Sequence, residues 1–151
     1  MRIGVISDTH GLLRPEALAA LRGSNLVIHA GDVGSPDVLD AIGAIAPTIA
    51  VRGNVDTQAW AQALPDTKIV EADALKLIVI HQIADLDFDP VAQLLGAVIC
   101  GHSHKPSIEW RDGVLFLNPG SAGPRRFKLP VTLARLDISG PTATAQIITL
   151  G

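Results

Sequence analysis

Apolar runs and polar segments alternate along the first two thirds of the chain, and five of the runs end at a side chain that can bind a metal. Short continuous apolar runs are typical of buried strands, and ligands collect at the carboxyl ends of strands in open α/β sheets. We therefore predict a metal site assembled from strand ends. The runs are residues 3–7 before Asp8 and His10, 26–30 before Gly31 and Asp32, 49–52 before Gly53 and Asn54, 77–80 before His81, and 97–100 before Gly101-His102-Ser103-His104.

The first third of the chain predicts strands alternating with helices. Pro15 suits the first turn of one helix, and Ser35 can cap a second helix whose apolar residues recur at near-helical spacing. A β-α-β-α-β order predicts right-handed crossovers and a parallel sheet with helices on its faces. The expected strands cover residues 2–7, 26–30 and 48–52, with helices over 16–21 and from 36 onward.

The remainder predicts strands that are paired more locally. Asp112-Gly113 is a two-residue hairpin signal between two apolar segments. We expect strands over residues 68–71, 75–81, 97–100, 107–111, 114–117, 131–138 and 142–149, a short helix or loop over 57–65, and a helix over 90–95 opened by Asp89. The last third is thus expected to build a second, largely antiparallel sheet. The fold class is α/β, with two facing sheets flanked by helices in a single domain over residues 1–151.

Composition narrows the function classes. The net charge is −3, and the only basic cluster is Arg125-Arg126 with Lys128, so we expect no nucleic-acid partner. The single cysteine, Cys100, cannot form an internal disulfide, which favours a reducing, cytoplasmic setting. No apolar run approaches the roughly 18 residues of a membrane span, and the first residues turn polar too soon for a signal peptide.

The strand-end side chains offer too many ligands for one metal ion. They comprise two carboxylates, one amide and four imidazoles, which suit two metals that share a bridging carboxylate and a solvent molecule: Asp8, His10, Asp32, Asn54, His81, His102 and His104. Mixed nitrogen and oxygen ligands without thiolate favour two divalent ions, Mn first with Fe, Zn, Ni or Co as alternatives, over Ca or Mg. Such a pair activates water and clamps a phosphoryl group, so metal-assisted hydrolysis is the expected chemistry.

The order of these motifs is similar to that of a known family. Asp8-Thr9-His10, Gly31-Asp32, Gly53-Asn54, His81 and Gly101-His102-Ser103-His104 together resemble the signature of the calcineurin-like metallophosphoesterases. Each motif alone is weak, but their order over residues 8–104 is specific. The segment Asn118-Pro119-Gly120-Ser121 and the small size resemble the prokaryotic phosphodiesterase branch, which is related to the small retromer subunit.

The resemblance implies a ligand set, a fold and an activity. It implies that Asp8, His10, Asp32 and His104 hold one metal, and that Asp32, Asn54, His81 and His102 hold the other. Asp32, Asn54 and His102 are the candidate catalytic residues. The implied fold is a four-layer α/β/β/α sandwich, and the implied reaction is hydrolysis of a phosphate ester by a hydroxide that bridges two metal ions.

Two positions depart from the family pattern. Val55 stands where many members have a histidine that assists the leaving group or binds phosphate, and Gln82 stands where glycine usually follows the metal-binding histidine. Without an acid at position 55, small diesters with good leaving groups are better substrates than monoesters with poor ones. Gln82 either crowds the substrate or forms a hydrogen bond with it. We therefore expect a small phosphate-ester substrate.

Two other functions and several residue roles stay open. The same fold can serve as a non-catalytic protein-interaction scaffold, and a binuclear hydrolase can act on nucleic acid; a homodimer is also open. His29 lies inside a strand and is interpreted as structural, and Arg52 as a surface or packing residue. Arg125 and Arg126 either bind phosphate or are simply solvated. Residues 118–121 are expected to form a turn that supports the site.

Overall fold

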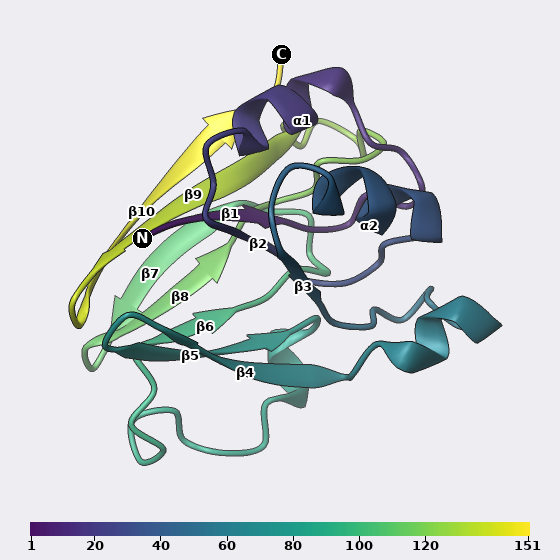
Figure 1. Cartoon of the computed structure of the whole chain (residues 1–151). Coiled ribbons are helices and arrows are strands. Elements are labelled where there is room, and N and C mark those ends of the chain that lie inside the picture. Colours follow the sequence, from purple (N-terminus) through teal and green to yellow (C-terminus); the bar gives the residue numbers. More distant parts are fainter.

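A computed structural model describes residues 1–151 as two five-stranded sheets (Figure 1). In the first sheet the strand order is β10-β9-β1-β2-β3, and β1, β2 and β3 are parallel. The antiparallel pair β9 and β10 extends this sheet beyond β1. The strands of this sheet are β1 (Arg2–Ile6), β2 (Leu26–His29), β3 (Thr48–Ala50), β9 (Thr132–Ser139) and β10 (Thr142–Thr149).

The second sheet has the order β4-β5-β6-β8-β7. Its three central strands β5, β6 and β8 are parallel, and the edge strands β4 and β7 are antiparallel to their neighbours. Its strands are β4 (Thr67–Ala72), β5 (Leu75–Ile80), β6 (Ala97–Ile99), β7 (Ser107–Arg111) and β8 (Val114–Asn118). Both sheets are therefore mixed, and the two-sheet α/β architecture expected from the sequence is confirmed.

The main core lies between the two sheets. A cluster of 19 buried residues draws on both, with Val5 and Ile28 from the first sheet and Leu77 and Ile99 from the second. Burial of this apolar surface holds the sheets face to face, which fixes the ends of β1 and β2 relative to those of β5 and β6. The strand ends therefore meet along one edge of the sandwich.

Two helices cover the outer face of the first sheet (Figure 1). Helix α1 (Pro15–Leu21) and helix α2 (Pro36–Gly43) both begin at a proline, and the hydroxyl of Ser35 accepts a hydrogen bond from the amide of Asp37. None of the helices has the length and apolar character needed to cross a bilayer. Between β3 and β4 the expected short helix forms as a 3₁₀ segment, η1 (Ala59–Ala63).

The outer face of the second sheet is covered by loop rather than by an α-helix. The only regular element in residues 81–96 is the 3₁₀ segment η2 (Ile83–Asp85), and Leu95 packs on β5 and β6. The helix predicted over 90–95 is wrong. A single turn forms, with the amide of Leu95 donating to Pro90, and the left-handed Leu94 (φ 58°) stops it. One turn is too short to repay the cost of helix nucleation.

The expectation that the last third builds the second sheet is confirmed for the hairpin β7–β8 and wrong for β9 and β10. The hairpin β9–β10 joins the first sheet because β9 pairs antiparallel with β1, with Arg2 opposite Asp137 and Val5 opposite Ala134. The second sheet is completed instead by β4, β5 and β6 from the middle of the chain. An alternating strand pattern identifies the face that is buried, but it does not identify the neighbour with which the strand pairs.

Candidate metal centre

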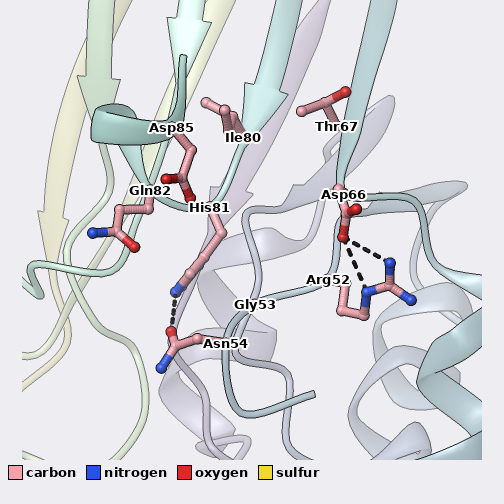
Figure 2. Close-up of a pocket in the computed structure, with 9 residues that line it drawn as sticks. All are labelled: Arg52, Gly53, Asn54, Asp66, Thr67, Ile80, His81, Gln82 and Asp85. Atoms are coloured by element: carbon pink, nitrogen blue, oxygen red, sulfur yellow. Dashed lines mark hydrogen bonds and ion pairs between the residues drawn. The ribbon is translucent and has the colours of Figure 1, made fainter. Parts of the chain in front are cut away.

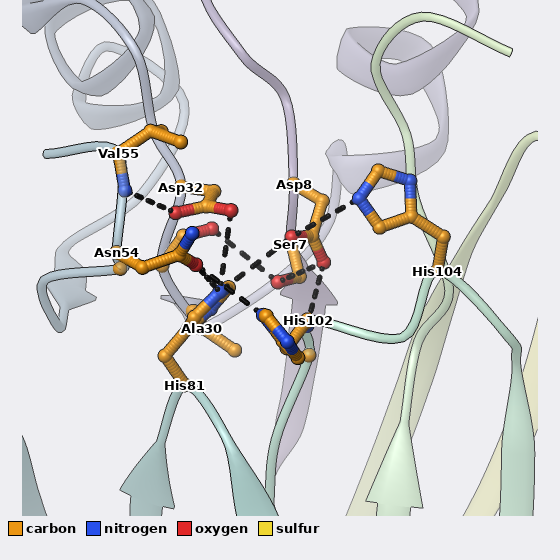
Figure 3. A network of polar contacts seen from close by, with 12 residues as sticks. Ser7, Asp8, Ala30, Asp32, Asn54, Val55, His81, His102 and His104 are labelled. Atoms are coloured by element: carbon orange, nitrogen blue, oxygen red, sulfur yellow. Dashed lines mark hydrogen bonds and ion pairs between the residues drawn. The ribbon is translucent and has the colours of Figure 1, made fainter. Parts of the chain in front are cut away.

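The structure brings all seven candidate side chains to one edge of the sandwich, and Figure 3 labels each of them except His10. Loops after β1, β2 and β3 of the first sheet supply Asp8, His10, Asp32 and Asn54, and loops after β5 and β6 of the second supply His81, His102 and His104. Each sheet thus contributes one side of the cluster. This convergence of the two sets of strand ends is what the resemblance implied.

The cluster divides into two groups of potential ligands. Ligand atoms of Asp8, His10 and His104 lie within 4.8 Å of one another, as do those of Asp32, His81 and His102. Asp32 joins the two groups, because its Oδ2 lies 3.3 Å from His81 Nε2 and 3.7 Å from His10 Nε2. The structure therefore contains two adjacent groups that could each hold a metal ion, with Asp32 between them.

Asn54 completes the second group. Its Oδ1 lies 3.1 Å from His81 Nε2 and 3.3 Å from His102 Nδ1. His81 Nδ1 is 2.7 Å from the carbonyl oxygen of Ala30. That contact places the proton on Nδ1 and leaves the Nε2 lone pair directed at the cluster, as in metal-bound histidines held by a carbonyl.

The backbone at these strand ends adopts an uncommon conformation. Five of the seven candidates have positive φ angles, which non-glycine residues rarely adopt outside functional sites: Asp8 (56°), His10 (47°), Asp32 (55°), His102 (72°) and His104 (63°). Asp and His tolerate this region better than most residues do. The left-handed turns redirect side chains from different strands toward a common point.

Some of the candidate ligand atoms have no hydrogen-bond partner, which suits them to bind metal ions. In the first group, Asp8 Oδ1 and His10 Nε2 are buried and have no hydrogen-bond partner, and His104 turns its Nε2 toward Asp8 Oδ1 at 3.5 Å. In the second, the side-chain amide of Asn54 lies against the Asp32 carboxylate and the ring nitrogens of His81 and His102. Buried polar atoms are normally paired, and a cation satisfies several acceptors at once. The cluster is therefore composed as a binding site for cations.

The two carboxylates are held in different electrostatic states. Burial raises the pKa of Asp8, although the charge of His81 and the hydrogen bond from Ser7 oppose it. Burial also acts to raise the pKa of Asp32. The hydrogen bonds from His81 and from the backbone N–H of Val55 outweigh this effect and lower the pKa to about 2. Asp32 is therefore ionised at neutral pH.

The pKa values of the imidazoles are also shifted in different directions. Burial lowers the pKa of His104 to about 4, assisted by the charges of Arg126 and His10, so this ring stays neutral and able to bind a metal. Burial acts to lower the pKa of His81, but the hydrogen bonds to Asp32 and to the Ala30 carbonyl outweigh burial and raise this pKa. A cation between His81 and Asp32 would take the place of that proton.

One residue that organises the cluster was given no role by the sequence. Asp56 is 1% exposed, and its carboxylate accepts hydrogen bonds from the amides of Val33 (3.1 Å), Gly34 (3.0 Å) and Gly53 (2.9 Å). It therefore ties the loop that carries Asp32 to the loop that carries Asn54. Its only signal in the sequence is an acid two positions after Gly53-Asn54, where a solvated loop carboxylate would look the same.

His29 and the segment after β8 support the site as expected. Buried His29 lies 3.0 Å from the hydroxyl of Thr9 and accepts a hydrogen bond from the Gly31 amide, so it is not directed at the cluster. The side-chain amide of Asn118 donates to the carbonyl of Gly101 before the paired histidines. The hydroxyl of Ser121 donates to the carbonyl of Asp8 at 2.9 Å.

A cavity of about 430 Å³ opens beside the second group of ligands (Figure 2). Its lining includes Asn54, His81, Gln82 and Arg52, whose guanidinium contacts Asp66 at 2.7 Å. Gln82 also lines a second cavity of about 270 Å³ on the side of His102. Gln82 therefore stands between two hollows next to the cluster.

Position 55 offers no acid to a leaving group. The side chain of Val55 is 43% exposed, while its backbone amide donates to Asp32 Oδ1 at 3.0 Å. The residue therefore acts on the cluster only through its main chain.

The comparisons with known proteins agree with the geometry. The model of the calcineurin-like phosphoesterase superfamily domain matches residues 1–140. A Methanothermobacter thermautotrophicus protein named "Probable metallophosphoesterase" is 35% identical over 166 residues, covering 100% of this chain and 94% of its own. A solved archaeal phosphodiesterase is 29% identical with a TM-score of 0.81, covering 98% of this chain and 100% of its own. Zinc-complexed Vps29 of Entamoeba histolytica, 20% identical with a TM-score of 0.75 over 100% of both chains, shares the fold.

Proposed function

Because the chain belongs to the calcineurin-like phosphoesterase superfamily, we propose that it is a divalent-metal-dependent phosphodiesterase that hydrolyses small diesters. The observation that carries the proposal is the convergence of two groups of carboxylate and imidazole ligands, in which Asp8 Oδ1 and His10 Nε2 are buried without a hydrogen-bond partner. The proposal assigns Asp8, His10, Asp32 and His104 to one metal position. It assigns Asp32, Asn54, His81 and His102 to the other. Mn is the first candidate, with Fe, Zn, Ni and Co as alternatives.

In the proposed reaction, contacts around Asp32 and Asp8 hold these candidate ligands in position. When bound, two divalent ions supply positive charge for the phosphoryl oxygens and a water acidic enough to attack phosphorus at neutral pH. Asp32 is held in place by the Val55 amide and the ring of His81. Asp8 is oriented by the Ser7 hydroxyl (2.9 Å) and the His102 amide (3.1 Å). These contacts fix the ligand geometry before substrate arrives, so little reorganisation accompanies the reaction.

Two ligands of the second group are open to the hollows beside the cluster. His102 is partly buried and Asn54 is exposed, and each lines one of the two cavities next to Gln82, whereas Asp8 and Asp32 are almost fully covered and the partly buried His10 lines neither cavity. We therefore assign Asn54 and His102, with the bridging Asp32, as the catalytic residues that lie against the substrate phosphate. Because Val55 provides no proton, the leaving group must depart as a stable anion. This favours aryl diesters and other diesters with acidic leaving groups over alkyl monoesters.

The test is hydrolysis of bis(p-nitrophenyl) phosphate by the purified chain of residues 1–151. Protein stripped with a chelator is expected to be inactive and to regain turnover with Mn²⁺, and Fe²⁺, Zn²⁺, Ni²⁺ and Co²⁺ are compared in the same assay. The Asp32→Asn and His104→Ala variants should lose turnover while their circular dichroism spectra stay native. Asp87→Ala, an exposed carboxylate outside the cluster, is the matched control.

Each alternative function has its own result in these experiments. Full turnover in the presence of chelator would remove the metal-dependent proposal. Folded protein that binds metal but hydrolyses no mono- or diester with any of these ions would favour the non-catalytic scaffold. Tight binding of single-stranded nucleic acid at physiological salt in a gel-shift assay would favour a nuclease.

A further inference from the structure

The surroundings of the metal centre are electrically unequal on its two sides. On the side of β4 and β5, the cavity in Figure 2 contains one cation, Arg52, and two acids, Asp66 and Asp85. Arg52 already contacts Asp66 through two of its nitrogens and donates to the side chain of Gln62. This side therefore carries a surplus of negative charge and suits an uncharged part of a substrate.

The opposite side is bordered by a basic turn anchored to the site itself. The amide of Ala122 donates to the carbonyl of Ser7 at 3.1 Å, and the guanidinium of Arg14 donates to the carbonyl of Gly123. A Cβ on Gly123 would lie 2.3 Å from the carbonyl oxygen of Thr9, so the chain passes directly against the Asp8–Thr9 loop. The residues that follow must therefore emerge at the rim of the metal centre.

These residues form a turn with an unusual surface, defined here as the basic turn of residues 125–128. The amide of Leu129 donates to the carbonyl of Arg126 and closes it. Phe127 lies between two cations, is 90% exposed and has a positive φ of 54°. The ring of Phe127 therefore offers an open aromatic face beside two cations, against which a planar group can stack.

The cations of this turn have no carboxylate partners. Every ion pair of a lysine or arginine in the chain involves Arg2, Arg52 or Arg111, and none involves a residue of the basic turn. Lys105, which directly follows His104, is also unpaired and lines one hollow together with Phe127 and Lys128. Four uncompensated positive charges therefore lie beside the first group of metal ligands.

We propose that the basic turn, together with Lys105, binds a second phosphate on the non-scissile arm of the diester, and that Phe127 stacks against a planar group such as a nucleobase. The preferred substrates are then nucleotide-like diesters with an additional phosphate, oriented so that the uncharged leaving group occupies the cavity of Figure 2. Arginine matches phosphate oxygens through paired donors, and aromatic rings stack on bases of any sequence. The inference rests on the proposed phosphodiesterase function.

The experiment compares two substrates that differ by one phosphate. They are thymidine 5′-(p-nitrophenyl phosphate) and its 3′-phosphorylated derivative, both followed by release of p-nitrophenolate from the Mn²⁺-loaded protein. At low ionic strength the kcat/KM of the 3′-phosphorylated substrate is expected to be about tenfold higher, as two exposed ion pairs of modest strength allow. About 0.5 M salt should bring the ratio close to one, because screening is strong at that concentration.

Variants locate the origin of the preference. The double variant Arg125→Ala/Arg126→Ala should lower the ratio toward one, whereas Arg22→Ala/Lys76→Ala removes the same charge from exposed positions elsewhere and should retain it. Phe127→Ala should raise KM for both nucleotides, and an unchanged KM would refute the stacking role. The inference would be overturned if wild-type protein had the same kcat/KM for both substrates. It would also be overturned if the double arginine variant kept the wild-type preference for the 3′-phosphorylated substrate.

The outcomes separate this inference from the function on which it rests. Hydrolysis of neither substrate with any metal would overturn the proposed function itself. Equal hydrolysis of both would leave the phosphodiesterase intact and remove only the second phosphate site. An anionic membrane surface would use the same chemistry. Co-sedimentation with phosphatidylserine vesicles that depends on Arg125 and Arg126, combined with an equal substrate ratio, would assign the turn to lipid and overturn the inference.

Discussion

Removal of the Asp56 side chain tests how the two ligand loops of the first sheet are held together. Asp56 Oδ2 accepts hydrogen bonds from the amides of Val33 and Gly53, and Oδ1 accepts one from Gly34. Two of these bonds are fully buried and the third partly so. Because Asp56 is 1% exposed, the amides that it accepts from are shielded from bulk water. The Asp56→Ala variant therefore leaves three donors without acceptors.

The cost can be estimated from the bonds lost. A hydrogen bond to a charged group contributes about 1.5 to 3 kcal/mol, and the three share one acceptor, so the losses do not add fully. We expect Asp56→Ala to lower the free energy of unfolding by about 3 to 5 kcal/mol, a large part of the roughly 5 to 15 kcal/mol of a typical domain. Asp56→Asn keeps one accepting oxygen but turns an amide nitrogen toward a backbone N–H. Its expected loss is about 1 to 2 kcal/mol.

The assay is urea unfolding of metal-free protein, followed by the fluorescence of Trp60 and Trp110. Asp87→Ala is the control and should stay within about 0.5 kcal/mol of wild type. Mn²⁺ titration of Asp56→Asn should also show about 10- to 100-fold weaker binding, because supporting partners of ligands typically have effects of this size. An Asp56→Ala variant within about 1 kcal/mol of wild type would refute the argument.

Three further predictions follow from buried atoms. A Cβ on Gly53 would lie 2.1 Å from Asp32 Oδ1, so Gly53→Ala should displace this ligand and abolish Mn²⁺-dependent turnover; retained turnover would contradict it. Burial lowers the pKa of His29 to about 4 from 6.5, so the native state resists a proton that the unfolded chain accepts. Stability should therefore fall by roughly 3 kcal/mol as the pH drops from about 6.5 to 4. Urea unfolding at several pH values should show this fall reduced in His29→Asn, and identical pH dependence would refute the assignment. Burial raises the pKa of Cys100 to about 11, so Ellman's reagent should label no thiol at pH 8 in native protein and one in denaturant. Rapid native labelling would show that the thiol is accessible.

Much of the molecule could be predicted from the sequence because the signals are local. Continuous apolar runs gave the strands, and Pro15 and Ser35 marked the starts of the two helices. The candidate ligands follow directly from the ends of those runs, since a strand that stops at a sheet edge delivers its next residue there. Their order along the chain was sufficient to identify the family, which the comparisons confirm.

The partition of strands between sheets depended on tertiary structure. β9 pairs with β1 rather than with β8. The loop between β8 and β9 would allow pairing with either strand, so the sequence did not distinguish the two pairings. The helix predicted over 90–95 also depended on context, because residues such as Leu95 are apolar enough for a helix but pack on the sheet as a turn. Local patterns specify which residues are buried without specifying their partners.

The sequence by itself determined which side chains are candidate metal ligands, and only the tertiary structure decided how these side chains are positioned. The positive φ angles of Asp8 and Asp32, the single acid Asp56 joined to three amides, and the basic turn at the rim all arise where distant segments meet. In the sequence, an aspartate that accepts hydrogen bonds from buried amides cannot be distinguished from an aspartate in solvent. What separates them is desolvation, which exists only after the two sheets have closed on each other.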